Sequence, residues 1–301
     1  MSVSRGFVYL RALRPAQWLK NGVVPAAYFF ARWDPSQSEH VRGLVPVLAV
    51  AVAVACFCAL SSAVYLINDL QDIEADRAHP VKRLRPLASG ALSKRSAMVL
   101  ASGLLITAFG CSLILPPAYT ALMTAYLLMQ LLYTFLLKKI AYVDVFIIAT
   151  GFVMRATAGA LALSVRISPW LLLCTFLLAL FLALCKRRHE KIMFIEKEEQ
   201  HRVALSGYNL KVLDLQIGII ASATLVCYSI YTLSAETVAR FGTSGLGLTI
   251  PFVVFGIFRY LDLVYTNQDG GRPEKVLLTD KVMIITILCY GLTALAVFLY
   301  C

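Results

Sequence analysis

Three acidic residues follow directly on a long apolar run, and their spacing is that of a metal site. Asp69, Asp72 and Asp76 fall within an arc of about 60° if the chain is helical here, at about 100° per residue. One helix face would then present three carboxylates, which repel one another and are costly near a membrane unless a cation joins them. Mg²⁺ prefers a few carboxylate oxygens together with phosphate oxygens and water. The spacing therefore predicts a magnesium site with positions left open for a diphosphate.

The residue before this trio has a side-chain oxygen that could join the site. Asn68 is one helical step from Asp69, so its amide oxygen would lie at the edge of the acidic face. We predict Asn68, Asp69, Asp72 and Asp76 as metal ligands, and the three aspartates as the catalytic residues. The alternative is a solvated acidic cap on a helix end, paired with nearby arginines.

Basic residues follow immediately in a segment that also contains prolines and a glycine. Proline and glycine interrupt regular secondary structure, so we expect residues 77–90 to form a loop of defined conformation. Arginine suits bidentate contact with phosphate, and lysine supplies a point charge. We predict that Arg77, Lys82, Arg83 and Arg85 bind phosphate groups of the substrate. Alternatively, these charges serve only to set the membrane topology.

Other polar residues are expected at or near the same membrane surface. An arginine within an apolar span, as at position 155, is a functional candidate by default. The alternatives are an anchoring belt around Trp18, a structural pair for Arg155, and a solvated face for the charged loop expected to begin at Lys186. The remaining predicted substrate-binding residues are Arg14, Lys20, Asn21, Tyr133, Lys138, Asp144, Arg155, Lys186 and Arg187.

The elements that must position these residues are transmembrane helices. The chain is 59% hydrophobic and 15% charged, against about 45–50% and 25% in soluble domains. A membrane-spanning helix needs about 20 apolar residues. We predict an all-α, polytopic helical bundle of about nine transmembrane helices, forming one domain over residues 1–301. The candidate runs are 21–33, 43–67, 96–115, 118–137, 143–164, 170–185, 212–233, 244–264 and 282–300.

The basic residues indicate which side of the membrane carries the aspartates. With these helices alternating, 22 of the 28 Lys and Arg residues fall on the side that holds the N-terminus and residues 68–95. Positively charged loops stay cytoplasmic. We therefore predict that the N-terminus and the active site face the cytoplasm at a bacterial inner membrane. The net charge of +11 is then mainly a topology signal, and we expect no nucleic-acid partner.

Taken together, these motifs resemble a known family. The pattern Asn68-Asp69-x-x-Asp72-x-x-x-Asp76 is similar to the first aspartate motif of the UbiA superfamily of intramembrane prenyltransferases. Segments 13–21, 85–90, 151–155 and 184–188 resemble its decaprenyl-phosphate phosphoribosyltransferase branch. The superfamily usually carries a second motif, Asp-x-x-x-Asp, whereas here Asp144 is followed four residues later by Ile148. This departure weakens a mechanism that cleaves a prenyl diphosphate and fits the phosphoribosyl branch.

The resemblance implies an activity and its partners. It implies Mg²⁺-dependent transfer of 5-phosphoribosyl from phosphoribosyl diphosphate to a polyprenyl (decaprenyl) phosphate, with release of diphosphate, in the synthesis of cell-wall arabinan precursors. One alternative is transfer of a prenyl group from its diphosphate to an aromatic or other acceptor. Another is a transporter whose acidic cluster binds a cation, although polar clusters gathered at one surface are not typical of transporters. Assembly into a homo-oligomer stays open.

Overall fold

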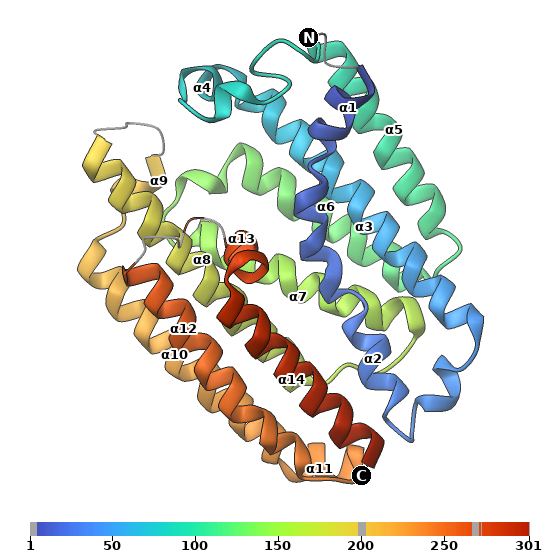
Figure 1. Ribbon diagram of the computed structural model, residues 1–301. Coiled ribbons are helices and arrows are strands. Elements are labelled where there is room, and N and C mark those ends of the chain that lie inside the picture. The colour runs from blue at the N-terminus through green and yellow to red at the C-terminus, as the bar shows by residue number, and fades with distance from the viewer. Residues whose placement is uncertain (1–4, 198–202, 267–270, 272, 301) are drawn as a thin grey trace. The chain divides into compact units, whose positions relative to one another are not determined.

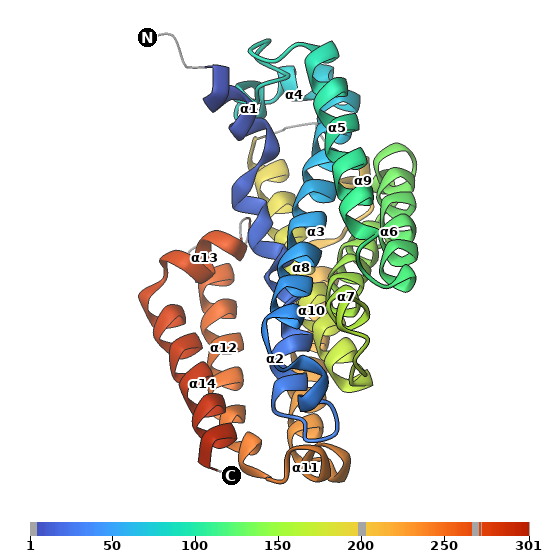
Figure 2. The same ribbon diagram turned by 90° about the vertical axis from the view of Figure 1, so that its right-hand side faces the viewer.

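The structure is a computed structural model that describes residues 5–197, 203–266, 271 and 273–300, and it is built from helices (Figures 1 and 2). No strand occurs in these residues, so the all-α prediction is confirmed. In chain order the elements are α1 (Arg5–Leu13), η1 (Pro15–Val23), α2 (Ala26–Arg32), η2 (Ser38–Val41), α3 (Leu44–Gln71), α4 (Ile73–Ala78), η3 (Lys82–Leu84), α5 (Lys94–Ser112), α6 (Pro117–Phe135), η4 (Leu137–Lys139), α7 (Val143–Leu163), α8 (Pro169–Lys197), α9 (Val203–Ser206), α10 (Leu210–Leu233), α11 (Ala235–Phe241), η5 (Gly245–Thr249), α12 (Ile250–Thr266), α13 (Pro273–Thr279) and α14 (Lys281–Tyr300).

Seven helical segments of the described chain are long and apolar enough to cross a membrane: 44–71, 94–112, 143–163, 169–193, 210–233, 245–266 and 281–300. The predicted count of nine is therefore not confirmed. The run 21–33 is divided at Pro25, which cannot donate a helical hydrogen bond, and leaves only the seven residues of α2. The run 118–137 does form helix α6, although α6 is not among these seven segments.

The chain folds as two compact units. The first comprises residues 1–29, 40–138 and 154–165, and the second comprises 30–39, 139–153 and 166–301. In the first unit, α3 lies alongside α5, as both views show, and Phe57, Leu60 and Tyr119 are fully buried in its core. In the second, α8 packs on α10 and α12 on α14. All three motif aspartates belong to the first unit.

One predicted loop is helical. We expected a charged loop to begin at Lys186, but α8 continues as a helix through Lys197. Arg187 Nη1 donates to Glu190 Oε2 at 2.6 Å, and opposite charges three residues apart on a helix favour its continuation. The end of an apolar run shows where a membrane span ends. The helix itself can continue beyond that point.

Candidate active site

The helix that carries the aspartates is interrupted within the motif. Helix α3 ends at Gln71 and α4 begins at Ile73, with Asp72 (φ −100°, ψ 12°) between them. The amide of Asp72 still donates to Asn68 O, and the amide of Asp76 donates to Asp72 O. The expected single helical face is thus a kinked pair of helices, because Asp72 leaves the helical conformation.

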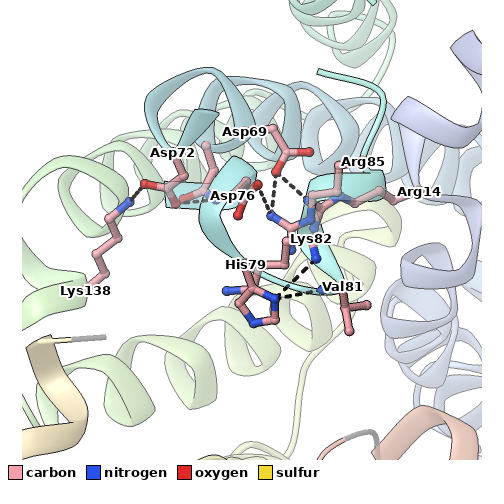
Figure 3. Close-up of polar contacts among 10 residues, drawn as sticks. Arg14, Asp69, Asp72, Asp76, His79, Val81, Lys82, Arg85 and Lys138 are labelled. Atoms are coloured by element: carbon pink, nitrogen blue, oxygen red, sulfur yellow. Dashed lines mark hydrogen bonds and ion pairs between the residues drawn. The ribbon is translucent and has the colours of Figure 1, made fainter. Parts of the chain in front are cut away.

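Two of the three aspartates share one arginine. Arg85 Nη1 lies 2.6 Å from Asp76 Oδ2 and 3.1 Å from Asp69 Oδ1 (Figure 3). Arg14 Nη2 donates to the same oxygen of Asp69. Asp69 and Asp76 are each only 4% exposed. Since one nitrogen touches both carboxylates, their contacting oxygens are close neighbours in a nearly dry environment.

The third aspartate has its own partners. Asp72 Oδ1 lies 2.5 Å from Lys138 Nζ, and Asp72 Oδ2 accepts a hydrogen bond of 3.2 Å from the Asn68 amide. The side chain of Asp72 is 29% exposed, against 5% for Asp69 and for Asp76. Lys138 arrives on η4, just after α6 ends. The structure therefore places a cation against each of the three carboxylates.

Local sequence explains the position of Arg85. Arg85 precedes Pro86, which disfavours helical backbone at the preceding residue, and Arg85 is accordingly extended (φ −65°, ψ 146°). Leu87 and Leu92 are buried in the apolar core beneath the loop. Gly90 (φ 79°) allows the tight turn between them. The loop backbone is thus held from below, and the guanidinium projects to the aspartates.

Arg14 is held in a similarly specific way. Its backbone is left-handed (φ 54°), an uncommon conformation for a residue other than glycine. Trp18 Nε1 donates to Ser62 Oγ, and Ser62 Oγ donates to Leu13 O, so η1 and α1 are fastened to α3. The Arg14 guanidinium lies 4.9 Å from the ring centre of Tyr65. The backbone at both Arg14 and Arg85 is therefore fixed by local contacts, and both side chains extend to the aspartates.

Two predicted substrate-binding residues instead bind each other. Arg155 is 5% exposed and Asn21 is fully buried. Arg155 Nε donates to Asn21 Oδ1 at 2.8 Å, and Arg155 Nη2 donates to the Tyr126 hydroxyl at 2.6 Å. The Asn21 amide in turn donates to Cys58 Sγ. These contacts favour the structural pair that the sequence left open for Arg155.

The other predicted residues of the first unit lie on elements around the motif. Arg77 pairs with Glu74 at 3.2 Å and donates to Ala88 O. Lys82 is half-buried and Arg83 is exposed, both on η3. The remaining two, each half-buried, are Lys20 on η1 and Tyr133 on α6.

Three predicted residues belong to the second unit. Asp144 and Arg187 are almost fully buried, with Arg187 Nε 3.6 Å from Asp144 Oδ2, while Lys186 is half-buried on α8. The Tyr208 hydroxyl donates to Asp144 Oδ1 at 2.5 Å and accepts from the Tyr142 amide. Burial and the neighbouring carboxylate of Asp144 raise the pKa of Tyr208, so its hydroxyl remains a donor. Sequence reasoning missed Tyr208, which lies 64 residues from Asp144 with no motif to connect them.

The donor set fits a metal shared with a ligand rather than one enclosed by protein. Within the described ranges, no three or more His, Cys, Asp or Glu side chains converge closely enough to hold a metal by themselves. Mg²⁺ usually takes one or two carboxylates and completes its shell with phosphate oxygens and water. The neighbouring oxygens of Asp69 and Asp76 meet that smaller requirement.

Comparison with known proteins identifies the family. The model of the UbiA prenyltransferase family matches residues 27–279. The chain is 34% identical to decaprenyl-phosphate phosphoribosyltransferase of Mycolicibacterium smegmatis, covering 93% of this chain and 89% of that protein. Its namesake in Corynebacterium glutamicum is 33% identical, with 93% and 83% covered.

Solved structures agree with the sequence comparison. A UbiA homologue from Archaeoglobus fulgidus, solved with DMAPP and Mg²⁺, superposes with a TM-score of 0.70 over 97% of this chain and 99% of that one, at 17% identity. At that identity the likeness concerns the fold. With the family match and the apolar helices, it confirms the resemblance drawn from the aspartate motif. The chain belongs to the UbiA prenyltransferase family and is a multi-pass membrane transferase.

Proposed function

We propose that this enzyme transfers 5-phosphoribosyl from phosphoribosyl diphosphate to a polyprenyl phosphate such as decaprenyl phosphate, in a Mg²⁺-dependent reaction. The observation that carries the proposal is the alternation of three carboxylates with Arg14, Arg85 and Lys138 at the end of α3. Such a surface suits a diphosphate joined to a divalent cation. The names of the relatives point to the same donor class, and cell-wall arabinan synthesis is the corresponding role.

The chain's basic residues would bind and orient the donor. Arg14, Arg85 and Lys138 already lie at the carboxylates, and Lys82 and Arg83 lie on the same loop as Arg85. Positive groups fixed in place before the reaction stabilise charge that builds on a leaving group. When bound to Asp69, Asp72 and Asp76, with Asn68 at the edge, Mg²⁺ would supply further charge neutralisation on the diphosphate.

The transfer itself needs little acid-base chemistry. An oxygen of the lipid phosphate, already an anion at neutral pH, forms a bond to the anomeric carbon of ribose. The bond from that carbon to the diphosphate oxygen breaks, and its electron pair leaves with the diphosphate. The protein's contribution is then mainly positioning of the two anions and electrostatic stabilisation.

We further place this site on the cytoplasmic face of a bacterial inner membrane, within one domain that spans the chain. The distribution of lysine and arginine over the nine alternating apolar runs predicted from the sequence supports that side. The donor is a water-soluble sugar phosphate, whereas the acceptor is a lipid whose headgroup sits at the membrane surface. A site where a membrane helix ends at the surface is reached by both.

The test is a transfer assay with purified protein in detergent or vesicles. Labelled phosphoribosyl diphosphate, decaprenyl phosphate and Mg²⁺ should yield a labelled lipid and free diphosphate, and chelation of the metal should stop both. Folding is checked in parallel by thermal unfolding. Well-folded protein that forms no labelled lipid would count decisively against the proposal.

Prenyl transfer is the second candidate, because the matched family model is that of prenyltransferases. In that reaction the isoprenoid would be part of the donor diphosphate, and an aromatic or other compound would be the acceptor. Competition separates the two: phosphoribosyl diphosphate should displace labelled inorganic diphosphate far more effectively than a prenyl diphosphate does. The opposite order would favour prenyl transfer.

A further inference from the structure

Arg85 occupies the oxygens that a metal ion would need. Its Nη1 contacts Asp76 Oδ2 at 2.6 Å and Asp69 Oδ1 at 3.1 Å. A guanidinium nitrogen and a divalent cation cannot both sit between these two oxygens, because they would occupy the same space and their positive charges repel. The sequence predicts Arg85 as a phosphate-binding residue, whereas in the structure it binds the two carboxylates.

Charge balance makes this conflict informative. Asp69 and Asp76, both nearly dry, are matched by two cations, Arg14 and Arg85. A divalent cation added to this neutral group leaves an excess positive charge in a poorly solvated place, which is unfavourable. A diphosphate that arrives together with the cation removes that excess. Metal and diphosphate should therefore bind cooperatively.

The side chain of Arg85 is able to change partners. It is 27% exposed, while the carboxylates it holds are 5% exposed, so one side of the guanidinium is open to a ligand. The backbone at Arg85 is constrained by Pro86 and by the buried Leu87. Exchange then requires rotation of the side chain alone.

We propose that Arg85 is an internal counter-ion that competes with the metal for Asp69 and Asp76, and that it passes to the phosphates when metal and diphosphate bind together. This inference rests on the proposed function, since it takes Mg²⁺ and a diphosphate as the ligands. It assigns Arg85 two opposite effects: it weakens binding of the metal alone and strengthens binding of the metal with diphosphate.

The experiment uses the full-length protein and two calorimetric titrations, one with Mg²⁺ alone and one with Mg²⁺ and inorganic diphosphate. Arg85→Gln should tighten binding of Mg²⁺ alone by about tenfold and weaken binding of diphosphate with Mg²⁺ by about tenfold, the size expected for one charge-assisted contact. Arg95→Gln is the matched control, because Arg95 is an exposed arginine at the start of α5. It should move neither constant by more than about twofold.

Opposite shifts in the two titrations support the inference. It is overturned if Arg85→Gln leaves Mg²⁺ affinity unchanged or weakens it, because an arginine that only braces the site cannot compete with the metal. Should that variant not fold, Arg85→Lys replaces it: the single ammonium loses the forked geometry and should shift both constants in the same directions by a smaller factor. Weaker Mg²⁺ binding in Arg85→Lys than in wild type would equally overturn the inference.

Failure of this inference can be distinguished from failure of the proposed function. Wild-type protein that forms the labelled ribosyl lipid, while Arg85→Gln shows no opposite shifts, refutes only the role of Arg85. Opposite shifts in a protein that forms no such lipid refute the phosphoribosyl assignment and leave the counter-ion in place.

Discussion

Asp72 differs from the other two motif aspartates in its access to solvent and in its partner. Its side chain is 29% exposed and bound to Lys138, whereas Asp69 and Asp76 are buried around Arg85. A carboxylate in this position can be changed with little effect on packing. Asp72 is therefore the residue at which a role in the reaction can be separated from a role in folding.

Replacing Asp72 with asparagine should lower turnover by about 10²–10³, the usual effect of removing one preorganised charged group. Its thermal unfolding temperature should change little. The measurement is the rate of transfer to lipid beside an unfolding curve. Glu74→Gln is the control, because Glu74 is 79% exposed and pairs with Arg77 on the same short helix. Full activity in Asp72→Asn would remove Asp72 from the proposed metal site.

At the scale of elements, a single glycine allows close packing in the first unit. A Cβ placed on Gly159 of α7 would lie 1.9 Å from the backbone oxygen of Val24 and 3.4 Å from Ala27. Small residues permit such close approach of backbones within membranes. Since Val24 follows η1, which carries Asn21, this contact also supports the partner of Arg155.

Gly159→Ala should therefore lower the free energy of unfolding by several kcal/mol, at least as much as other substitutions that overpack a core. The effect is large because the added methyl group clashes with backbone atoms. Thermal unfolding in detergent is the measurement. Gly103→Ala on α5 is the matched control, since a Cβ there meets nothing within 4 Å and alanine favours helix. Equal unfolding temperatures for the two variants would show that the contact is looser than the structure has it.

Also at the scale of elements, a buried carboxylate joins separate segments of the second unit. Asp34, which is 3% exposed, accepts hydrogen bonds from Ser36, Gln37 and Arg240. Arg240 Nη2 also donates to the backbone oxygen of Arg166. Burial acts to raise the pKa of Asp34, but these hydrogen bonds outweigh it and hold the pKa below its usual value. The ionised form is thus the one that fastens the segments.

Because the folded pKa of Asp34 is lowered, its stabilisation is present above the unfolded pKa of about 3.9 and is lost as pH falls through the folded pKa. Asp34→Asn should lower the unfolding temperature at pH 7, with the difference from wild type shrinking below about pH 4. Unfolding curves across this range measure it. Asp262→Asn, whose carboxylate is 53% exposed beside Arg259, should have little effect at any pH. A pH-independent deficit in Asp34→Asn would contradict the assignment.

At the scale of the whole molecule, the sidedness of the membrane decides which substrates can reach the aspartates. His40 and Glu74 are exposed residues on either side of α3, which spans residues 44–71. If α3 crosses the membrane, the two positions are on opposite sides. On the proposed orientation, Glu74 lies in the cytoplasm.

A membrane-impermeant thiol reagent should label Glu74→Cys only in inverted vesicles and His40→Cys only in right-side-out vesicles. The unmodified protein, with its own cysteines, supplies the background. The readout is the labelled fraction on a gel. Labelling of Glu74→Cys from the outside would place the aspartates away from a cytoplasmic sugar phosphate and would contradict the proposed function.

Much of this protein could be predicted from sequence because the signals are local. Long apolar runs indicate membrane helices whatever their neighbours, and the spacing of Asp69, Asp72 and Asp76 indicates an acidic cluster at a helix end. The family followed from the same motif and was confirmed by comparison. Composition could not show that the run 21–33 breaks at Pro25 or that α8 continues past Lys186.

By itself, the sequence determined the class, the helices and the acidic motif, since each depends on residues adjacent in the chain. Only the tertiary structure decided the partners: that Arg85 bridges Asp69 and Asp76, that Lys138 pairs with Asp72, and that Arg155 is bound to Asn21. The physical reason is that a charge near a membrane must be matched in space. Several basic residues along the chain have the charge needed to pair with these carboxylates. Only the packing of the helices decides which of them lies next to each carboxylate.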